Sequence, residues 1–263
     1  MDASGAKALA EKSGNGLQCR VASHFRSAEW AVLLSPYYVD LTTDKTRESD
    51  LIVERAFSVP VVFVGVPPES IRLRLFIECK YVPPKDGGVV FWMGEKDRPQ
   101  TEKWVQQHTP FFRDHISFSE HHYIKGNEPV AKLFTSERGS GDEADPFFRA
   151  INQCLNNFIH NAKRESLWSR RTQNEQVTKL DYPVLICSDF RQFFSTSAAT
   201  LADPVPLACS AFQVELNYAY VNAEGAKSQG YFLVDVVDFS RIDSFVSTLL
   251  SEAEAAKNLR ALT

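Results

Sequence analysis

Two short stretches carry the charged residues most able to do chemistry together. Residues 47–50 read RESD and end in Asp50, just before an apolar segment, while residues 76–80 read FIECK, with Glu78 and Lys80 two positions apart. Ionised side chains are costly to bury unless they are paired or bound to a metal. Either these charged side chains are exposed to solvent on the surface, or they converge on a bound group that is itself charged.

A strand at FIECK would bring the charges onto one surface. Side chains of a strand alternate between two faces, so Glu78 and Lys80 share one face while Ile77 and Cys79 share the other. If the strand that begins at Asp50 pairs antiparallel with it, Asp50 comes near Lys80. Two convergent carboxylates repel each other unless a cation lies between them, and Mg²⁺ prefers such oxygen ligands. With Lys80 holding the attacking water or the developing charge, this arrangement could hydrolyse a phosphodiester.

The same residues carry a resemblance to a known family. The stretch DLIVERAF followed by RLFIECKY resembles the PD-(D/E)XK nuclease superfamily, which has the restriction-endonuclease-like fold. The longer stretch WAVLLSPYYVDLTTDKTRESDLIVE is similar to the lead-in of Mrr-like and related bacterial members. Over residues 17–81 the resemblance implies an αβββαβ core, Asp50, Glu78 and Lys80 as catalytic residues, and Mg²⁺ as cofactor, with Mn²⁺ able to substitute. Ser49 departs from the usual aliphatic residue, and the long separation of the two acids implies an extended hairpin.

Further site residues follow from the resemblance. Cys79 would contribute its backbone carbonyl to the metal. Glu48 could ligate a second metal or could instead pair with Arg47, and both alternatives stay open. The core helix of the family often offers a glutamine or lysine to the site, which makes Gln153, in FFRAINQCLNNF, a candidate catalytic residue.

Hydrophobic periodicity predicts one α/β domain around a mixed sheet flanked by helices. Residues 1–16 are small and polar and are expected to be a flexible lead-in to a single nuclease-like domain, 17–263. Its core is placed at about 17–165, and strands and a helix at about 180–260 are expected to extend the same sheet. Asp145 is a predicted N-cap, with Pro146 at the first helical position. Helices are predicted within 16–30, 96–112, 145–171 and 240–259, and strands within 30–40, 50–57, 71–81, 89–94, 128–136, 182–188, 212–221 and 230–239.

The composition and net charge argue against several classes of protein. Of 263 residues 44% are hydrophobic and 24% charged, which is typical of a globular protein. No run of about 18 apolar residues predicts a membrane span, and the N-terminus lacks a secretory h-region, so a cytoplasmic protein is expected. The net charge of −4 counts against a broad non-specific nucleic-acid coat but not against a local basic cleft.

Cysteines and histidines give no metal-binding pattern. The five cysteines are scattered without a C-x-x-C pair and are interpreted as buried apolar residues. His121 and His122 are adjacent, and on a strand they would face opposite ways, so they are not expected to ligate one ion.

These observations favour a metal-dependent nuclease, with DNA placed ahead of RNA as the substrate. Nothing in the sequence recognises a 2′-hydroxyl either way. The alternative from a different class is a non-catalytic binding or scaffold protein that retains the fold. Nucleic acid is the expected partner, and the further partners considered are a second copy of the chain, in a homodimer, and a separate targeting protein.

Overall fold

The computed structural model describes residues 2–11, 13–41, 44–60, 69–85, 88–109, 119–126, 128–137, 145–163, 167, 176–200, 202–222 and 225–260. Its helices are α1 Ala3–Glu11, α2 Gly14–Ser27, α3 Arg98–His108, α5 Pro146–Asn161 and α6 Ile242–Arg260, with a short 3₁₀ turn at Phe239–Arg241. Among these helices, none combines the length and the apolar character needed to cross a bilayer.

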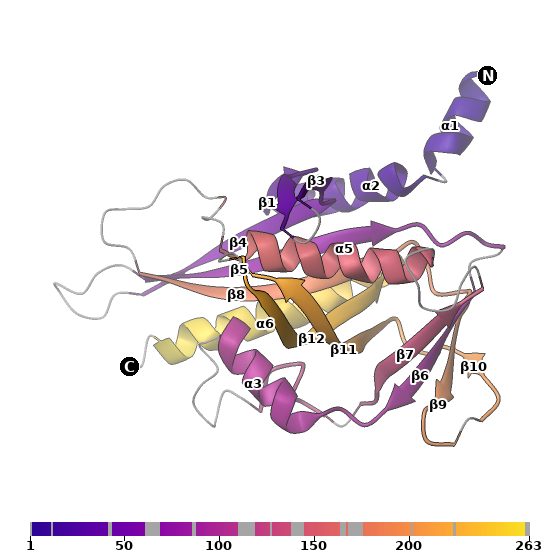
Figure 1. Ribbon diagram of the computed structural model, residues 1–263. Helices are drawn as coiled ribbons and strands as arrows, with labels where there is room; N and C mark the ends of the chain where they lie inside the picture. The colour runs from indigo at the N-terminus through magenta and orange to yellow at the C-terminus, as the bar shows by residue number, and fades with distance from the viewer. Residues whose placement is uncertain are drawn as a thin grey trace.

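A mixed sheet organises the described part of the chain (Figure 1). Its strands are β1 Ala31–Leu34, β4 Leu51–Val59, β5 Glu69–Lys80, β6 Val89–Gly94, β7 Val130–Ser136, β8 Gln176–Cys187, β9 Phe193–Ser197, β10 Val205–Pro206, β11 Ala211–Val221 and β12 Lys227–Asp238. Their order across the sheet is β1-β4-β5-β8-β12-β11-β7-β6-β9-β10. The expectation of an α/β protein with a mixed sheet is confirmed.

The strands around β5 form a mixed substructure. β1, β4 and β5 pair antiparallel in sequence order, whereas β8 runs parallel to β5 and β12 runs parallel to β8. Between β5 and α5 the chain forms β6, α3 and β7, and these two strands lie beyond β11. Helix α5 then packs on β5 and β8 and leads back to the sheet beside β5.

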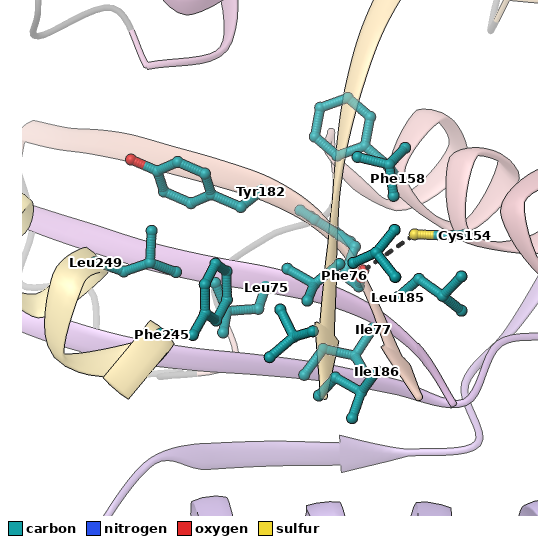
Figure 2. Packing of buried hydrophobic residues seen from close by; sticks show 14 of the residues in the cluster. Leu75, Phe76, Ile77, Cys154, Phe158, Tyr182, Leu185, Ile186, Phe245 and Leu249 are labelled. Carbon is teal, nitrogen blue, oxygen red and sulfur yellow. Dashed lines mark hydrogen bonds between the residues drawn. The ribbon is translucent and has the colours of Figure 1, made fainter. Parts of the chain in front are cut away.

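Both faces of β5 are covered, which explains why this strand is buried almost throughout. Leu75 and Ile77 have no exposed surface and point to one face, and Phe76 points to the other, where Phe158 of α5 meets it edge to face at 5.4 Å (Figure 2). The Cys154 thiol of α5 also donates to the Phe76 carbonyl at 3.8 Å. Helices α2 and α6 pack on β4 and β5 as well.

The start of α5 follows its predicted capping. The Asp145 carboxylate accepts hydrogen bonds from the backbone N–H groups of Phe147 at 2.7 Å and Phe148 at 3.2 Å. Pro146 occupies the first turn, where its missing N–H costs nothing. The cap fixes the end of α5 that lies closest to the end of β5.

Several predicted elements differ from the structure. The stretch 30–40 is two strands, because Ser35 adopts a positive φ of 51° and Pro36 follows it. The second of these, β2 Tyr37–Asp40, pairs with β3 Lys45–Glu48 in a separate two-stranded sheet, so the expected polar connection is partly a strand. The N-terminal lead-in contains helix α1, although none of its side chains is buried. Most of the stretch 58–70, which could extend the strand at 50–57 or form a hairpin arm that ends in a turn at 66–70, and most of the loop expected at 137–145 lie outside the described residues.

The C-terminal strands join the same sheet, as expected, but not at its edge. β8, β12 and β11 lie between β5 and β7, so they form the middle of the sheet. A parallel neighbour needs a long crossover, and here α5 and the segments before it provide one. The edge positions are instead taken by β1 and by β10, and β9 and β10 were not predicted.

Candidate active site

The antiparallel pairing of β4 and β5 brings the first two candidate residues together. Leu51 is paired with Ile77, so Asp50, one residue earlier, lies across from Glu78. The expected neighbour was Lys80, and the difference is a register shift of two residues. The Asp50 carboxylate reaches further and accepts a hydrogen bond from the Cys79 backbone N–H at 2.7 Å. The acid at the start of β4 is thereby fixed against the end of β5.

The backbone at Asp50 is held from two sides. Its carbonyl accepts hydrogen bonds from the Ser35 N–H at 2.8 Å and from the Gln18 amide of α2 at 2.9 Å. The Asn157 amide of α5 donates to the carbonyl of Leu51 at 3.3 Å. Both amides are buried within apolar helix faces, and such a buried polar residue is the signal that could have found them.

Glu78 is buried without compensation. Only 7% of the residue is exposed, and its Oε2 atom has no hydrogen-bond partner among the described residues. Burial raises the pKa of the Glu78 carboxyl well above its ordinary value, and the negative charge of Asp50 adds to the effect, while Lys80 opposes it. Such a group is stabilised in its ionised form by a cation next to it.

Asp50 titrates in an unusual range for the same reason. Burial raises the pKa of its carboxyl to about 6, although the hydrogen bond from the Cys79 N–H acts in the opposite direction. The charge of Glu48 raises it further. Near neutral pH Asp50 is therefore ready to take up a cation in place of a proton.

The metal-free protein is expected to lose stability through Asp50 as the pH rises. The pKa of about 6 in the folded state lies above the ordinary 3.8, so folding binds a proton between these values. The stabilisation that this bound proton contributes is fully present below about pH 4 and is lost as the pH rises through 6. The free energy of unfolding is expected to fall by about 1–3 kcal/mol over this range. Asp50→Asn cannot titrate, so in EDTA its free energy of unfolding relative to the wild type should rise across this range. Urea unfolding at a series of pH values measures the difference, and a difference that stays constant with pH would refute it.

Lys80 lies on the same face of β5 as Glu78 and is only partly exposed. Burial lowers the pKa of its ammonium group, and Arg149 acts in the same direction. Its side chain lines a cavity of about 80 Å³ together with Pro146 and Phe147 from the start of α5. Within the described chain no hydrogen bond or ion pair engages the ammonium, so it is available to a substrate.

Comparison with protein-family models, with curated proteins and with solved structures found no match. The chemistry of the site therefore has to be derived from its own residues. Asp50, Glu78 and Lys80 are the predicted residues that the structure brings together at the adjoining ends of β4 and β5.

The remaining predicted residues are less closely involved. Glu48 is exposed and accepts a hydrogen bond from the Tyr37 hydroxyl at 3.1 Å, although its charge still raises the pKa values of both site acids. The Cys79 thiol is buried, and strand alternation directs it to the face opposite Glu78. Gln153 is exposed and makes no hydrogen bond with a described residue. The α5 side chain that donates a hydrogen bond to the start of β4 is Asn157.

Tyr38 of β2 is a buried aromatic residue that contacts α5. It is 8% exposed and stacks on His160 of α5, with ring centroids 5.0 Å apart. Burial raises the pKa of its hydroxyl, and the charges of Asp40 and Glu78 act in the same direction. The stacking holds the small β2–β3 sheet against α5.

Proposed function

We propose that this protein is a metal-dependent nuclease that hydrolyses phosphodiester bonds, with DNA as the first substrate to test. The observation that carries the proposal is the convergence of two carboxylates beside an ammonium. Asp50 is fixed against Cys79, the Glu78 Oε2 atom is buried with no hydrogen-bond partner in the described part of the chain, and Lys80 follows on the same face of the strand.

The order of elements supports this proposal. Along the chain α2, β1, β4, β5, α5 and β8 follow the αβββαβ order that the family resemblance implies. In the sheet β1, β4, β5 and β8 are consecutive neighbours, with β5 and β8 parallel. The family places its two acids and its lysine on the second and third of these strands, which are β4 and β5 here.

The donor set fits a small divalent cation. Asp50 and Glu78 would hold Mg²⁺ with their carboxylates, Cys79 with its backbone carbonyl, and water would complete the shell. The unpartnered Oε2 atom of Glu78 is the buried charge that such an ion satisfies. The bound ion would supply a Lewis acid for the phosphate and would lower the pKa of a bound water.

The protein groups have separate tasks in the reaction. The oxygen of a water molecule bonds to phosphorus while the water gives up a proton to solvent. The bond from phosphorus to the leaving sugar oxygen breaks, and that oxygen takes up a proton. Lys80 would donate a hydrogen bond to the attacking water or to a non-bridging oxygen, where negative charge develops in the transition state. The hydrogen bonds to the Asp50 carbonyl and carboxylate would keep this acid in place while the reaction occurs.

A cleavage assay tests this function. Supercoiled plasmid, linear duplex, single-stranded DNA and RNA are incubated with the protein in Mg²⁺ or Mn²⁺, with an EDTA control. Metal-dependent cutting is expected, and the substrate panel decides between DNA and RNA. No cutting of any substrate, together with no Mn²⁺ binding by calorimetry, would overturn the proposal and favour the scaffold alternative.

A further inference from the structure

A second cluster of possible metal ligands lies away from the candidate active site. His121 and His122 belong to the turn before β7, and Glu252 comes from α6. One ligand atom from each of these three residues can be chosen so that all lie within 4.8 Å of one another. The expectation that the two histidines face apart was wrong, because they lie in a turn and their rings stack at 5.0 Å with an interplanar angle of 16°.

The ring of His122 is oriented by two carboxylates. Its Nδ1 atom lies 2.8 Å from Glu252 Oε1, and its Nε2 atom lies 3.2 Å from Asp235 Oδ2 on β12. Asp235 in turn accepts a hydrogen bond from the Tyr123 hydroxyl at 2.6 Å. A histidine that gives one N–H to a carboxylate and turns its other nitrogen toward a ligand position is the usual arrangement around a bound metal.

Glu252 and His121 also have ordered surroundings. The Tyr182 hydroxyl of β8 donates to Glu252 Oε2 at 3.0 Å and lies 3.4 Å from His121 Nε2. His121 has no exposed surface, and its Nδ1 accepts a bond from the Tyr123 N–H at 3.2 Å. The Thr109 hydroxyl also lies 3.3 Å from His121 Nε2, so polar groups orient both nitrogens of this ring.

A metal-free explanation accounts for only part of the cluster. A protonated His122 between Glu252 and Asp235 is a satisfied buried ion pair without any metal. That pair does not require a second imidazole, yet His121 is stacked against the first at full burial. Two imidazoles and a carboxylate are the donors that a transition metal selects.

The cluster borders a cavity at His122. His122 and Asp235 line this cavity of about 440 Å³, whose other walls include Phe245 and Thr248 of α6, while His121 and Glu252 lie behind them. A site for an ion needs such an entry path as well as its ligands.

We propose that His121, His122 and Glu252 bind one divalent transition-metal ion of the Zn²⁺ class, with Asp235 and Tyr182 orienting the ligands. The ion joins the 119–126 turn to α6, so it stabilises the fold on this side of the sheet. This site has nitrogen donors, whereas the carboxylate site at Asp50 has only oxygen donors, and the two should therefore select different metals. The inference is independent of the nuclease proposal.

Metal binding by the folded wild-type protein is the first test. After chelator treatment and gel filtration, Zn²⁺ is titrated by calorimetry in excess Mg²⁺, and bound metal is counted by elemental analysis. One equivalent of Zn²⁺ and a higher melting temperature are expected, and Co²⁺ should give visible absorption bands. If the wild-type protein does not retain Zn²⁺ and its melting temperature is unchanged, the proposal is refuted, and no variant is needed to reach this conclusion.

Variants then locate the ion. Glu252→Gln is expected to lower the Zn²⁺ affinity by more than about 100-fold, and Asp235→Asn by about 10–100-fold. Glu254→Gln, on the same helix but turned toward Lys257, and Asp50→Asn should both bind Zn²⁺ as the wild type does. Circular dichroism confirms that each variant is folded. Unchanged affinity in folded Glu252→Gln would refute the assignment, while loss in Asp50→Asn would place the ion at the nuclease site instead.

Discussion

Lys80→Ala is expected to lower the rate of metal-dependent phosphodiester cleavage by about 100–1,000-fold, the usual cost of removing a donor that stabilises transition-state charge. The metal affinity should remain, because Lys80 is not a ligand. The fold should also remain, since the ammonium makes no hydrogen bond or ion pair with a described residue. The rate at saturating Mg²⁺ and the Mn²⁺ affinity by calorimetry measure the two effects separately.

Two further variants test whether the loss of cleavage is specific to Lys80. Lys85→Ala removes the same charge from an exposed position five residues later and should cleave at the wild-type rate. Asp50→Asn should lose both cleavage and Mn²⁺ binding, which separates a metal ligand from a residue that acts on the substrate. Wild-type activity in Lys80→Ala would exclude its catalytic role, and an equal loss in Lys85→Ala would point to general electrostatic attraction of the nucleic acid.

Local patterns predicted the strand that carries the site. The strand predicted at 71–81 is β5, Glu69–Lys80, and this prediction depends only on residues that are neighbours in the chain. Burial does not alternate along β5, because both of its faces are covered. The capping of α5 was equally local, because Asp145 and Pro146 act within a single turn. Such features can be derived from a sequence since they require no knowledge of distant contacts.

Features that depend on distant contacts were missed. The register of β4 against β5 is set by pairing over a long connection, and the expected position of Asp50 was two residues off. The position of β8 between β5 and β12 depends on pairing with one segment about a hundred residues earlier and another about fifty residues later, which no local pattern encodes. His121 and His122 were treated as strand residues whose side chains point to opposite faces. They lie in a turn instead, where the two rings stack on each other.

The orientation of α5 about its axis explains why Gln153 is exposed and Asn157 is buried. The apolar stripe through Cys154 and Phe158 was predicted, and it faces the sheet as expected. Gln153 was considered because the family often offers a glutamine there, but it lies about 100° around the helix from Cys154 and is exposed. Asn157, three residues after Cys154, stays on the stripe and reaches the start of β4. A buried amide within an apolar stripe was the better indicator.

Arg74→Met is expected to destabilise the protein by about 3–5 kcal/mol, because it leaves the buried Asp181 carboxylate unpaired. Arg74 of β5 is 2% exposed and lies directly opposite Asp181 of β8. Its guanidinium donates to both carboxylate oxygens, at 2.7 and 2.6 Å, and to the Ala162 carbonyl at 2.6 Å. This pair spans the parallel contact that places β8 beside the strand of Glu78 and Lys80.

The pH and a second substitution test the origin of that loss. Burial raises the pKa of Asp181 even with Arg74 present, so without Arg74 the carboxyl can take up a proton, and the loss measured by urea unfolding should be smaller at low pH. Arg74→Met combined with Asp181→Leu removes both charges and should recover most of the stability, because apolar residues of similar volume can replace a buried ion pair. Arg26→Met, at an exposed position of α2, is the matched control and should change little. If the double variant is as unstable as Arg74→Met, the loss comes from packing around the arginine stem and its bond to Ala162 rather than from an unpaired charge.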